Sequence, residues 1–501
     1  MAAERAHLAV IGAGPAGLAA ALAAAGRGVR VTLIDSAARA GGQFYRQPAA
    51  GLRARRPRAL HHGWRTWERL SRALAVQVEA GTITHLADHH VWLVDRVDRV
   101  DRLARMDRVA RMEGMEGTER VDRSGTAHLP AGTGGFVVHA LRGPLQEDPG
   151  TVRADAVLLA TGGYEKLLPF PGWTLPGVVT AGGAQAMLKG TLVVPGRTAV
   201  VAGTGPLLLP VATGLAAAGV EVAALVESAD PRAFLRRAGA LAAQPGKVAE
   251  GAGYAARLLR HRVPLRTRHA VVEAHGEARL GAVTVAALDA DGHVRPGTER
   301  RIPCDTLAVG HGMLPHTDLA DGLGCRVEGV RVHVDEEQRT DVPGVWAAGE
   351  TTGVGGAALS LAEGRIAGHS IAARLRGAEP DPRDRSAATR SRTRLRAFSA
   401  ALDAVYAPPA RWTERVTDDT VVCRCEEVTA GAVRAAVDEL GAGDVRTVKL
   451  LTRAGMGWCQ GRMCEPAVAG LTGCEQTPVR RLLARPVPLG VLAVAGEPTD
   501  D

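Results

Sequence analysis

The sequence predicts an α/β protein with two Rossmann-like dinucleotide-binding domains followed by a small cysteine-containing domain. Two segments have the pattern of a buried strand, a glycine-rich turn, a helix and a second strand, and they begin at His7 and Thr198. Four of the seven cysteines form two tight pairs near the C-terminus. A chain of 501 residues is long enough for roughly three domains of ordinary size.

The composition is that of a globular protein. Hydrophobic residues make up 46% and charged residues 23%, which argues against general disorder. The formal net charge is +8, but the arginines are scattered and only 3% of the residues are aromatic, so we do not expect nucleic-acid binding. The cysteine layout does not suit a secreted disulfide framework, and we therefore expect a cytoplasmic protein. The apolar run 8–25 is interrupted by glycines and a proline, and no other segment is a candidate membrane span.

The first βαβ unit is predicted between residues 7 and 35. A strand precedes the turn Gly12-Ala-Gly14-Pro15-Ala-Gly17, an alanine-rich helix begins at about Pro15, and the next strand ends at Asp35. The three glycines permit a tight turn, close approach of a pyrophosphate and close helix packing, while the helix N-terminus supplies N–H donors. Asp35 can accept hydrogen bonds from an adenosine ribose. A plain tight turn is the alternative, but the complete pattern predicts a dinucleotide site.

Two later segments point to the cofactor of this first unit. The run Leu158-Leu-Ala-Thr161-Gly162 and the run 340–350, which ends in Gly349-Glu350, resemble those of two-dinucleotide-domain flavoproteins of the glutathione and thioredoxin reductase type. The resemblance covers residues 7 to about 375. It implies FAD in the first unit, contacts from these four residues, and an FAD fold split by the second nucleotide domain. An aspartate is usual in the family where Glu350 stands.

A third short segment is also similar to this family. Gly41-Gly42-Gln43 matches the loop that such proteins place beside the flavin, which implies that Gly42 and Gln43 contact the FAD. The alternative is a simple turn.

The second βαβ unit has a weaker fingerprint. The turn Gly203-Thr-Gly205-Pro-Leu-Leu208 lacks the third glycine, and Leu208 is expected to hold the helix farther from the strand. Glu227 ends the next strand, where a carboxylate would accept from a ribose 2′-OH and repel a 2′-phosphate, which favours NAD over NADP. Two alternatives stay open: a working NAD site, or a retained fold that holds another adenine nucleotide or nothing.

The cysteine pairs predict an iron-sulfur centre. Cys423-Arg-Cys425 and Cys459-Gln-Gly-Arg-Met-Cys464 supply four thiolates, the number that holds a 2Fe-2S cluster. Structural zinc sites usually use C-x2-4-C pairs, so the C-x-C pair makes zinc the weaker alternative. Cys474 is a reserve ligand.

The segment from Thr417 to Thr477 resembles the bacterioferritin-associated-ferredoxin-like 2Fe-2S domain, although its second pair is spaced C-x4-C instead of the usual C-x2-C. Lys449, Arg453 and Arg462 are candidates to offset the negative charge of the cluster.

Almost the whole chain resembles one family of flavoprotein subunits. The phrase 455–464, together with 169–177, 182–185 and 485–490, is similar to the FAD-containing alpha subunits of hydrogen cyanide synthase, octopine and nopaline oxidase and bacterial hydroxyproline dehydrogenases. The resemblance implies a beta subunit, resembling a flavin-dependent amine oxidase, that oxidises an amino or imino acid. This chain would then transfer electrons through FAD and the cluster to an acceptor that the sequence does not identify, a membrane-associated one included.

Two other functions are weighed against this interpretation. The first is a self-sufficient NADH-dependent reductase that drives electrons outward through its cluster, and the second is an inactive scaffold. The sequence contains no recognisable constellation for oxidising an amino acid, so catalytic residues stay unknown.

The expected organisation follows from these assignments. A Val-Asp-Arg repeat at 94–125 has a period that matches neither helix nor strand, and we expect a mobile insertion there. The predicted parts are the FAD-binding domain, first part, 1–166; an inserted NAD(P)-like domain, 167–300; the second part of the FAD-binding domain, 301–376; a linker, 377–416; a 2Fe-2S domain, 417–480; and a C-terminal tail, 481–501.

Overall fold

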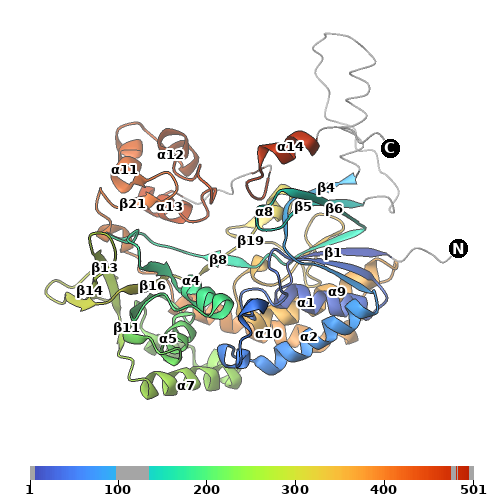
Figure 1. The fold of residues 1–501 in the computed structure, drawn as a ribbon, viewed down its shortest axis with the longest axis horizontal. Coiled ribbons are helices and arrows are strands. Elements are labelled where there is room, and N and C mark those ends of the chain that lie inside the picture. Colours follow the sequence, from blue (N-terminus) through green and yellow to red (C-terminus); the bar gives the residue numbers. More distant parts are fainter. Residues whose placement is uncertain (1–5, 98–134, 475–480, 482, 496–501) are drawn as a thin grey trace, which may run out of the picture.

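The computed structural model describes residues 6–97, 135–474, 481 and 483–495 (Figure 1). From residue 98 onward, the repeat expected at 94–125 lies outside the described residues. Among the helices in these ranges, none has both the length and the apolar character needed to cross a membrane.

The first sheet is parallel and is built from strands that are far apart in the sequence. Leu8 pairs with Val31 on one side and with Ala156 on the other. The strand order is β20-β7-β1-β2-β3. The strands are β1 (His7–Ile11), β2 (Arg30–Ile34), β3 (Ile83–Leu86), β7 (Ala156–Leu159) and β20 (Val345–Ala347). Because β20 follows the second nucleotide fold in the chain, the sheet is completed only when two distant segments meet.

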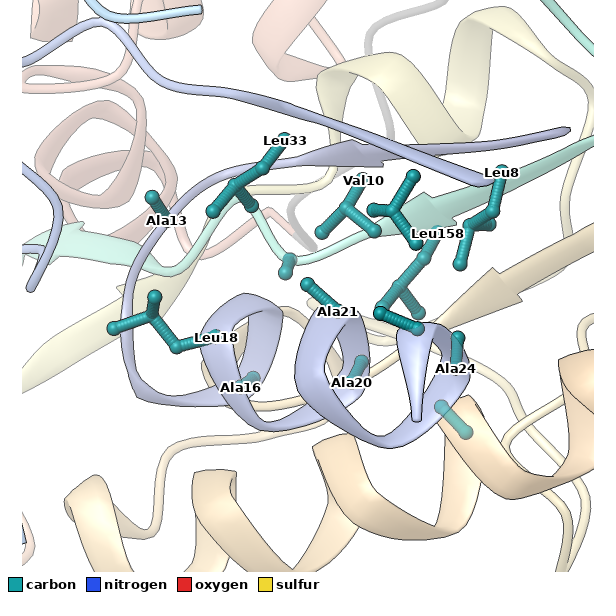
Figure 2. Close-up of a cluster of buried hydrophobic side chains, with 14 of the residues drawn as sticks. Leu8, Val10, Ala13, Ala16, Leu18, Ala20, Ala21, Ala24, Leu33 and Leu158 are labelled. Atoms are coloured by element: carbon teal, nitrogen blue, oxygen red, sulfur yellow. The ribbon is translucent and has the colours of Figure 1, made fainter. Parts of the chain in front are cut away.

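Helix α1 (Pro15–Ala25) is covered on two sides. Leu8 and Leu158 of the sheet pack above it, and helix α9 (Gly356–Arg374) packs against its other side (Figure 2). A Cβ atom on Gly364 of α9 would lie only 2.1 Å from the carbonyl oxygen of Ala16. A helix packed this closely on both sides has room only for small apolar side chains, which accounts for its alanines.

The second sheet is also parallel, in the order β12-β11-β10-β16-β9. Its strands are β9 (Val178–Thr180), β10 (Thr198–Gly203), β11 (Glu221–Glu227), β12 (Leu265–Thr267) and β16 (Thr306–Gly310). An antiparallel sheet of β13 (His269–His275), β14 (Ala282–Ala287) and β15 (Arg300–Pro303) accompanies it. The chain passes between the two nucleotide folds through β8 (Gly163–Glu165) and β17 (Met313–Pro315), which pair antiparallel.

The expected boundary at residue 300 is wrong. Residue 300 begins β15, and the fully buried strand β16 pairs with β10 in the middle of the second sheet. The second fold therefore continues to Gly310. The sequence does not place this last strand, because an apolar strand alone does not show which sheet it joins.

The expected linker at 377–416 is also wrong over most of its length. Residues Pro382–Val405 form helix α10, whose N-cap Asp381 accepts a hydrogen bond from the Arg383 amide. The second half of α10 buries Leu395 and Phe398 at helical spacing, and the helix packs against α9. No residue of its arginine-rich first half is buried, and this composition favours a linker when the sequence is considered alone.

The C-terminal cysteine module has its own apolar core. Its elements are β21 (Val421–Cys423), β22 (Val428–Thr429), α11 (Ala430–Asp438), α12 (Val445–Thr452) and α13 (Glu465–Thr472). The indole N–H of Trp173 donates to the carbonyl oxygen of Val421 at 2.6 Å, which joins the module to the second fold.

The segment after the module, expected as a tail, packs on the first fold. The Ala484 amide donates to the carbonyl oxygen of Trp92 at 2.9 Å, and Val491 of α14 (Leu489–Ala495) is buried with Trp92 and Leu141. Figure 1 shows α14 beside the antiparallel sheet formed by β4 (His89–Arg96), β5 (Phe136–Arg142) and β6 (Asp148–Ala154). The chain therefore returns to its first domain after the cysteine module.

Candidate functional site

A cavity of about 610 Å³ lies at the carboxyl ends of strands β1 and β2, where ligands bind in parallel α/β sheets. We call it the nucleotide cavity. The predicted FAD-contacting residues that line it are Gly12, Gly14, Pro15, Asp35, Gly42, Gln43, Thr161, Gly162 and Glu350. Gly17 and Gly349 are not in the lining. Both glycines instead permit close packing of the chain behind the cavity.

The three positions of the first turn are occupied by glycine for different structural reasons. Gly12 has φ +106°, and a Cβ atom on it would lie 2.2 Å from the carbonyl oxygen of Ala160. A Cβ atom on Gly17 would lie 1.8 Å from the carbonyl oxygen of Gly12. Gly14 has φ −72°, and its nearest neighbour would be 3.9 Å away. The fold therefore needs Gly12 and Gly17, whereas Gly14 leaves space that faces the cavity.

The N-terminus of α1 is open toward this space. Gly14 is its N-cap and supplies no side-chain hydrogen bond, and the first turn carries no acidic residue. In α11 and α12, by contrast, Thr429 and Asp444 accept hydrogen bonds from the first-turn amides. The first amides of α1 thus keep their hydrogen-bonding capacity, and with the helix dipole they favour an anion such as a pyrophosphate.

Asp35 is held at the end of β2 by two backbone amides. Its carboxylate accepts from Ala13 N at 2.5 Å and from Ala37 N at 2.7 Å. Burial raises the pKa of Asp35, and these two amides lower it again. The carboxylate is therefore oriented at the cavity wall, as binding a ribose requires.

The second predicted segment reaches the cavity from β20. Gly349 has φ +82°, and its amide donates to the Glu363 carboxylate at 3.0 Å. The next residue, Glu350, lines the cavity. Burial raises the pKa of Glu350. Thr161 donates through Oγ1 to the carbonyl oxygen of His316 at 2.7 Å, which joins the end of β7 to the same wall.

The four predicted cluster cysteines lie next to one another. The Cys425 side chain neighbours that of Cys459, which neighbours Cys464, and Cys464 in turn neighbours Cys423. The interaction between Cys459 and Cys464 lowers the pKa of Cys459 to about 5 and raises that of Cys464. Cys474, the reserve ligand, is turned away and contacts the Gly443 carbonyl. Four thiols joined in a row supply the donor set of a 2Fe-2S cluster.

The loop 455–464, which we call the cysteine loop, approaches the first cysteine pair closely. The Gly455 amide donates to Cys423 Sγ at 3.5 Å. A Cβ atom on Gly457 would lie 2.3 Å from Cys425 Cβ. Glycine is therefore needed for this approach, and amide donors to sulfur are a means of tuning such clusters.

Several lining residues of the nucleotide cavity were not predicted from the sequence. Trp458, Cys459 and Arg462 of the cysteine loop form part of its wall, as do residues 484–486. Arg462, which we expected beside the cluster charge, pairs with Asp318 of the first fold at 2.7 Å. The sequence signal for these residues is that the segments 455–464 and 485–490 are among those that resemble the flavoprotein subunit family. No spacing rule indicates that they meet.

The second nucleotide site differs from the first in its carboxylate. The Glu227 side chain accepts from Gly205 N and Ala229 N, each at 3.0 Å, and burial raises its pKa to about 7. Gly205 corresponds to Gly14, whose amide is left for a ligand in the first site. The longer Glu227 side chain thus occupies a donor that a pyrophosphate would use.

Other parts of the chain cover this second site. Leu208 is buried in the core at the start of α5 (Leu208–Ala217). Tyr406, after α10, packs on Phe234, and burial together with the charge of Glu227 raises its pKa to about 12. The cavity beside Gly203 measures about 10 Å³, room for about one water molecule.

Comparison with known proteins decides the family. The model of the pyridine nucleotide-disulphide oxidoreductase family matches residues 6–374, and that of the BFD-like 2Fe-2S binding domain matches residues 421–471. The chain belongs to the pyridine nucleotide-disulphide oxidoreductase family. The predicted fold class is thereby confirmed.

This oxidoreductase also has relatives along almost its whole length. Hydrogen cyanide synthase subunit HcnB of Pseudomonas protegens is 34% identical over 464 residues, which is 91% of this chain and 89% of that protein. An opine oxidase subunit of Agrobacterium tumefaciens is 31% identical over 486 residues, covering 94% and 86%. The structure of L-proline dehydrogenase from P. horikoshii shares the fold, with a TM-score of 0.58 at 18% identity over 98% of this chain and 80% of that one.

The oxidoreductase uses FAD and carries a 2Fe-2S cluster. The uncapped α1 N-terminus and the oriented Asp35 carboxylate fit the pyrophosphate and the ribose of FAD. The row of four thiols with the Gly455 amide fits the cluster. FAD accepts electrons in pairs and the cluster one at a time, so the two groups together can convert one kind of transfer into the other.

We predict that Gly14→Val loses FAD while the protein stays folded. Its backbone angles suit any residue, but the new side chain would occupy the space for the pyrophosphate, and flavin content should fall by about tenfold or more. Released flavin and iron content measure the two cofactors. Gly17→Val is the contrasting variant, because its clash with Gly12 should disrupt the fold itself. An unchanged flavin content in folded Gly14→Val would exclude this site.

We also predict that Cys459→Ser loses the cluster and keeps FAD, since one of four ligands is removed and the nucleotide cavity is otherwise intact. Iron and acid-labile sulfide analysis measures the loss. Cys474→Ser is the matched control and should keep its iron. Zinc without iron in anaerobically prepared wild-type protein would contradict the cluster assignment.

Proposed function

We propose that the chain is the electron-transfer subunit of a heteromeric amino- or imino-acid dehydrogenase or oxidase. The observation that carries this proposal is that the cysteine loop forms part of the nucleotide cavity wall. A flavin and a cluster that share one wall can exchange electrons without a further carrier. HcnB and the opine oxidase relative are both named as subunits, which supports a partner chain.

The proposed partner is a beta subunit resembling a flavin-dependent amine oxidase. Oxidation of an amino acid needs a pocket that holds its C–H against a flavin and a cation for its carboxylate. We assign no such constellation to this chain, and no catalytic residue. Hydroxyproline, opines and glycine, whose oxidation forms cyanide, are the substrate candidates that the family resemblance supplies.

The second nucleotide site argues against the alternative of an NADH-dependent reductase. The Gly205 amide donates to the Glu227 carboxylate. A nicotinamide cofactor whose pyrophosphate used this amide would have to displace the carboxylate. Residues Gly203, Gly205 and Glu227 therefore serve, in this proposal, the stability of the second fold.

The test compares the chain alone with the chain plus its beta partner. Alone, it should contain FAD and the cluster but should not oxidise proline, hydroxyproline, glycine or opines with an artificial dye as acceptor. Adding the partner should restore dye reduction. Full activity of the isolated chain, shown free of partner by mass spectrometry, would refute the proposed division of labour between two chains.

NADH is the second arm of the same experiment. Dithionite should bleach the flavin and NADH should not. Rapid bleaching by NADH would favour the reductase instead.

A further inference from the structure

One carboxylate of the first fold binds two arginines from the C-terminal part of the chain. Arg462, which lies between the ligands Cys459 and Cys464, donates from Nε to Asp318 Oδ2 at 2.9 Å, and its Nη2 forms an ion pair with the same oxygen at 2.7 Å. Arg481 donates from Nη1 to Asp318 Oδ1 at 2.7 Å. We call these three residues the Asp318 clamp.

On one side, the clamp is attached to the wall of the nucleotide cavity. Asp318 is the first residue of α8 (Asp318–Gly322) and lies 3.2 Å from Nε2 of His316, a lining residue. The His316 carbonyl accepts from Thr161 Oγ1 at 2.7 Å and from Thr351 Oγ1 at 2.9 Å. These threonines follow β7 and β20, so Asp318 is tied to both halves of the FAD fold.

On the other side, the clamp holds the backbone of the cysteine loop. Arg462 donates from Nη1 to the Cys459 carbonyl at 3.3 Å and from Nη2 to the Ala484 carbonyl. Arg481 donates to the Gln460 carbonyl. Both arginines therefore connect Asp318 to main-chain atoms beside the cluster ligands.

The clamp is more buried than the pairs Asp418–Arg434 and Glu426–Arg453 of the cysteine module. The side chains of Arg462, Arg481 and Asp318 are only 16%, 12% and 14% exposed. In the pair Asp418–Arg434, within the module, the aspartate is 77% exposed. Charge-assisted hydrogen bonds are strong where water is excluded. Removing the shared carboxylate would leave the largely buried Arg462 without its carboxylate partner and Arg481 with only Glu465, at 3.9 Å.

We propose that Asp318 is a positioning residue that holds the cysteine loop against the nucleotide cavity and so sets the rate of electron transfer between FAD and the 2Fe-2S cluster of one chain. The proposal rests on the proposed function. Each transfer would move one electron from the reduced flavin to the cluster, in which one ferric iron would become ferrous. The electron acceptor of the proposed function would reoxidise the cluster before the second electron follows, and the protons that the flavin loses on full reoxidation would pass to water.

The experiment uses the holoprotein with the variants Asp318→Asn, Asp318→Glu and the control Asp418→Asn. Light reduces the flavin in the presence of an electron donor, and the cluster absorbance follows the transfer. Asp318→Asn should keep its FAD and iron but transfer electrons roughly tenfold more slowly or worse, because small displacements strongly reduce such rates. Asp318→Glu should recover much of the rate, and Asp418→Asn should match the wild type.

Hydrogen–deuterium exchange supplies a second readout that does not depend on turnover. Amides of the cysteine loop should exchange faster in Asp318→Asn than in the wild type or Asp418→Asn. Wild-type transfer and wild-type exchange in Asp318→Asn would overturn the proposal.

Arg481→Gln covers the case in which Asp318→Asn fails to fold. It removes one arm of the clamp and leaves the Arg462–Asp318 pair, so an intermediate rate is expected. A folded Arg481→Gln with the wild-type rate would overturn the clamp while leaving the proposed function intact. If the reduced flavin of the wild-type protein does not reduce the cluster at all, the proposed function itself is overturned.

Discussion

The FAD fold depends on the close contact between α1 and α9. In the sequence, α1 precedes the inserted second domain and α9 follows it. Gly364 and Gly368 of α9 lie against Ala16 and Ala20 of α1, and added Cβ atoms would be 2.1 and 2.5 Å from the carbonyl oxygens of those alanines. The contact holds α1 between the sheet and α9 (Figure 2). The open N-terminus of α1 is thereby held at the strand ends, where the nucleotide cavity forms.

A buried carboxylate joins this contact to α10. Glu363 of α9 is fully buried; it accepts from the Gly349 amide and Thr352 Oγ1, each at 3.0 Å, and from Arg396 Nε at 2.9 Å. A buried charge is tolerated only when it is paired and hydrogen-bonded, so the segment that supplies Arg396 is part of the fold. This pairing explains why α10 is a packed helix and not a linker: it supplies the arginine that compensates the buried Glu363 carboxylate.

The sequence predicts those features whose chemistry depends on local spacing. The turn from Gly12 to Gly17, Asp35 and the cysteine pairs fall into this class, because strand, turn and ligand geometry follow from a few consecutive residues. The membership of β16 in the second sheet and the contact of residues 484–486 with the nucleotide cavity depend on long-range packing. Likewise, no local rule shows that Arg462 turns toward Asp318 instead of the cluster.

The central claim is that FAD and the cluster exchange electrons within a single chain. The most direct measurement is the rate of cluster reduction after rapid photoreduction of the flavin, recorded over a series of protein concentrations. Our account predicts a rate that does not change with concentration, since the cysteine loop lines the nucleotide cavity of its own chain. A rate that rises in proportion to protein concentration would show transfer between molecules and would contradict the account.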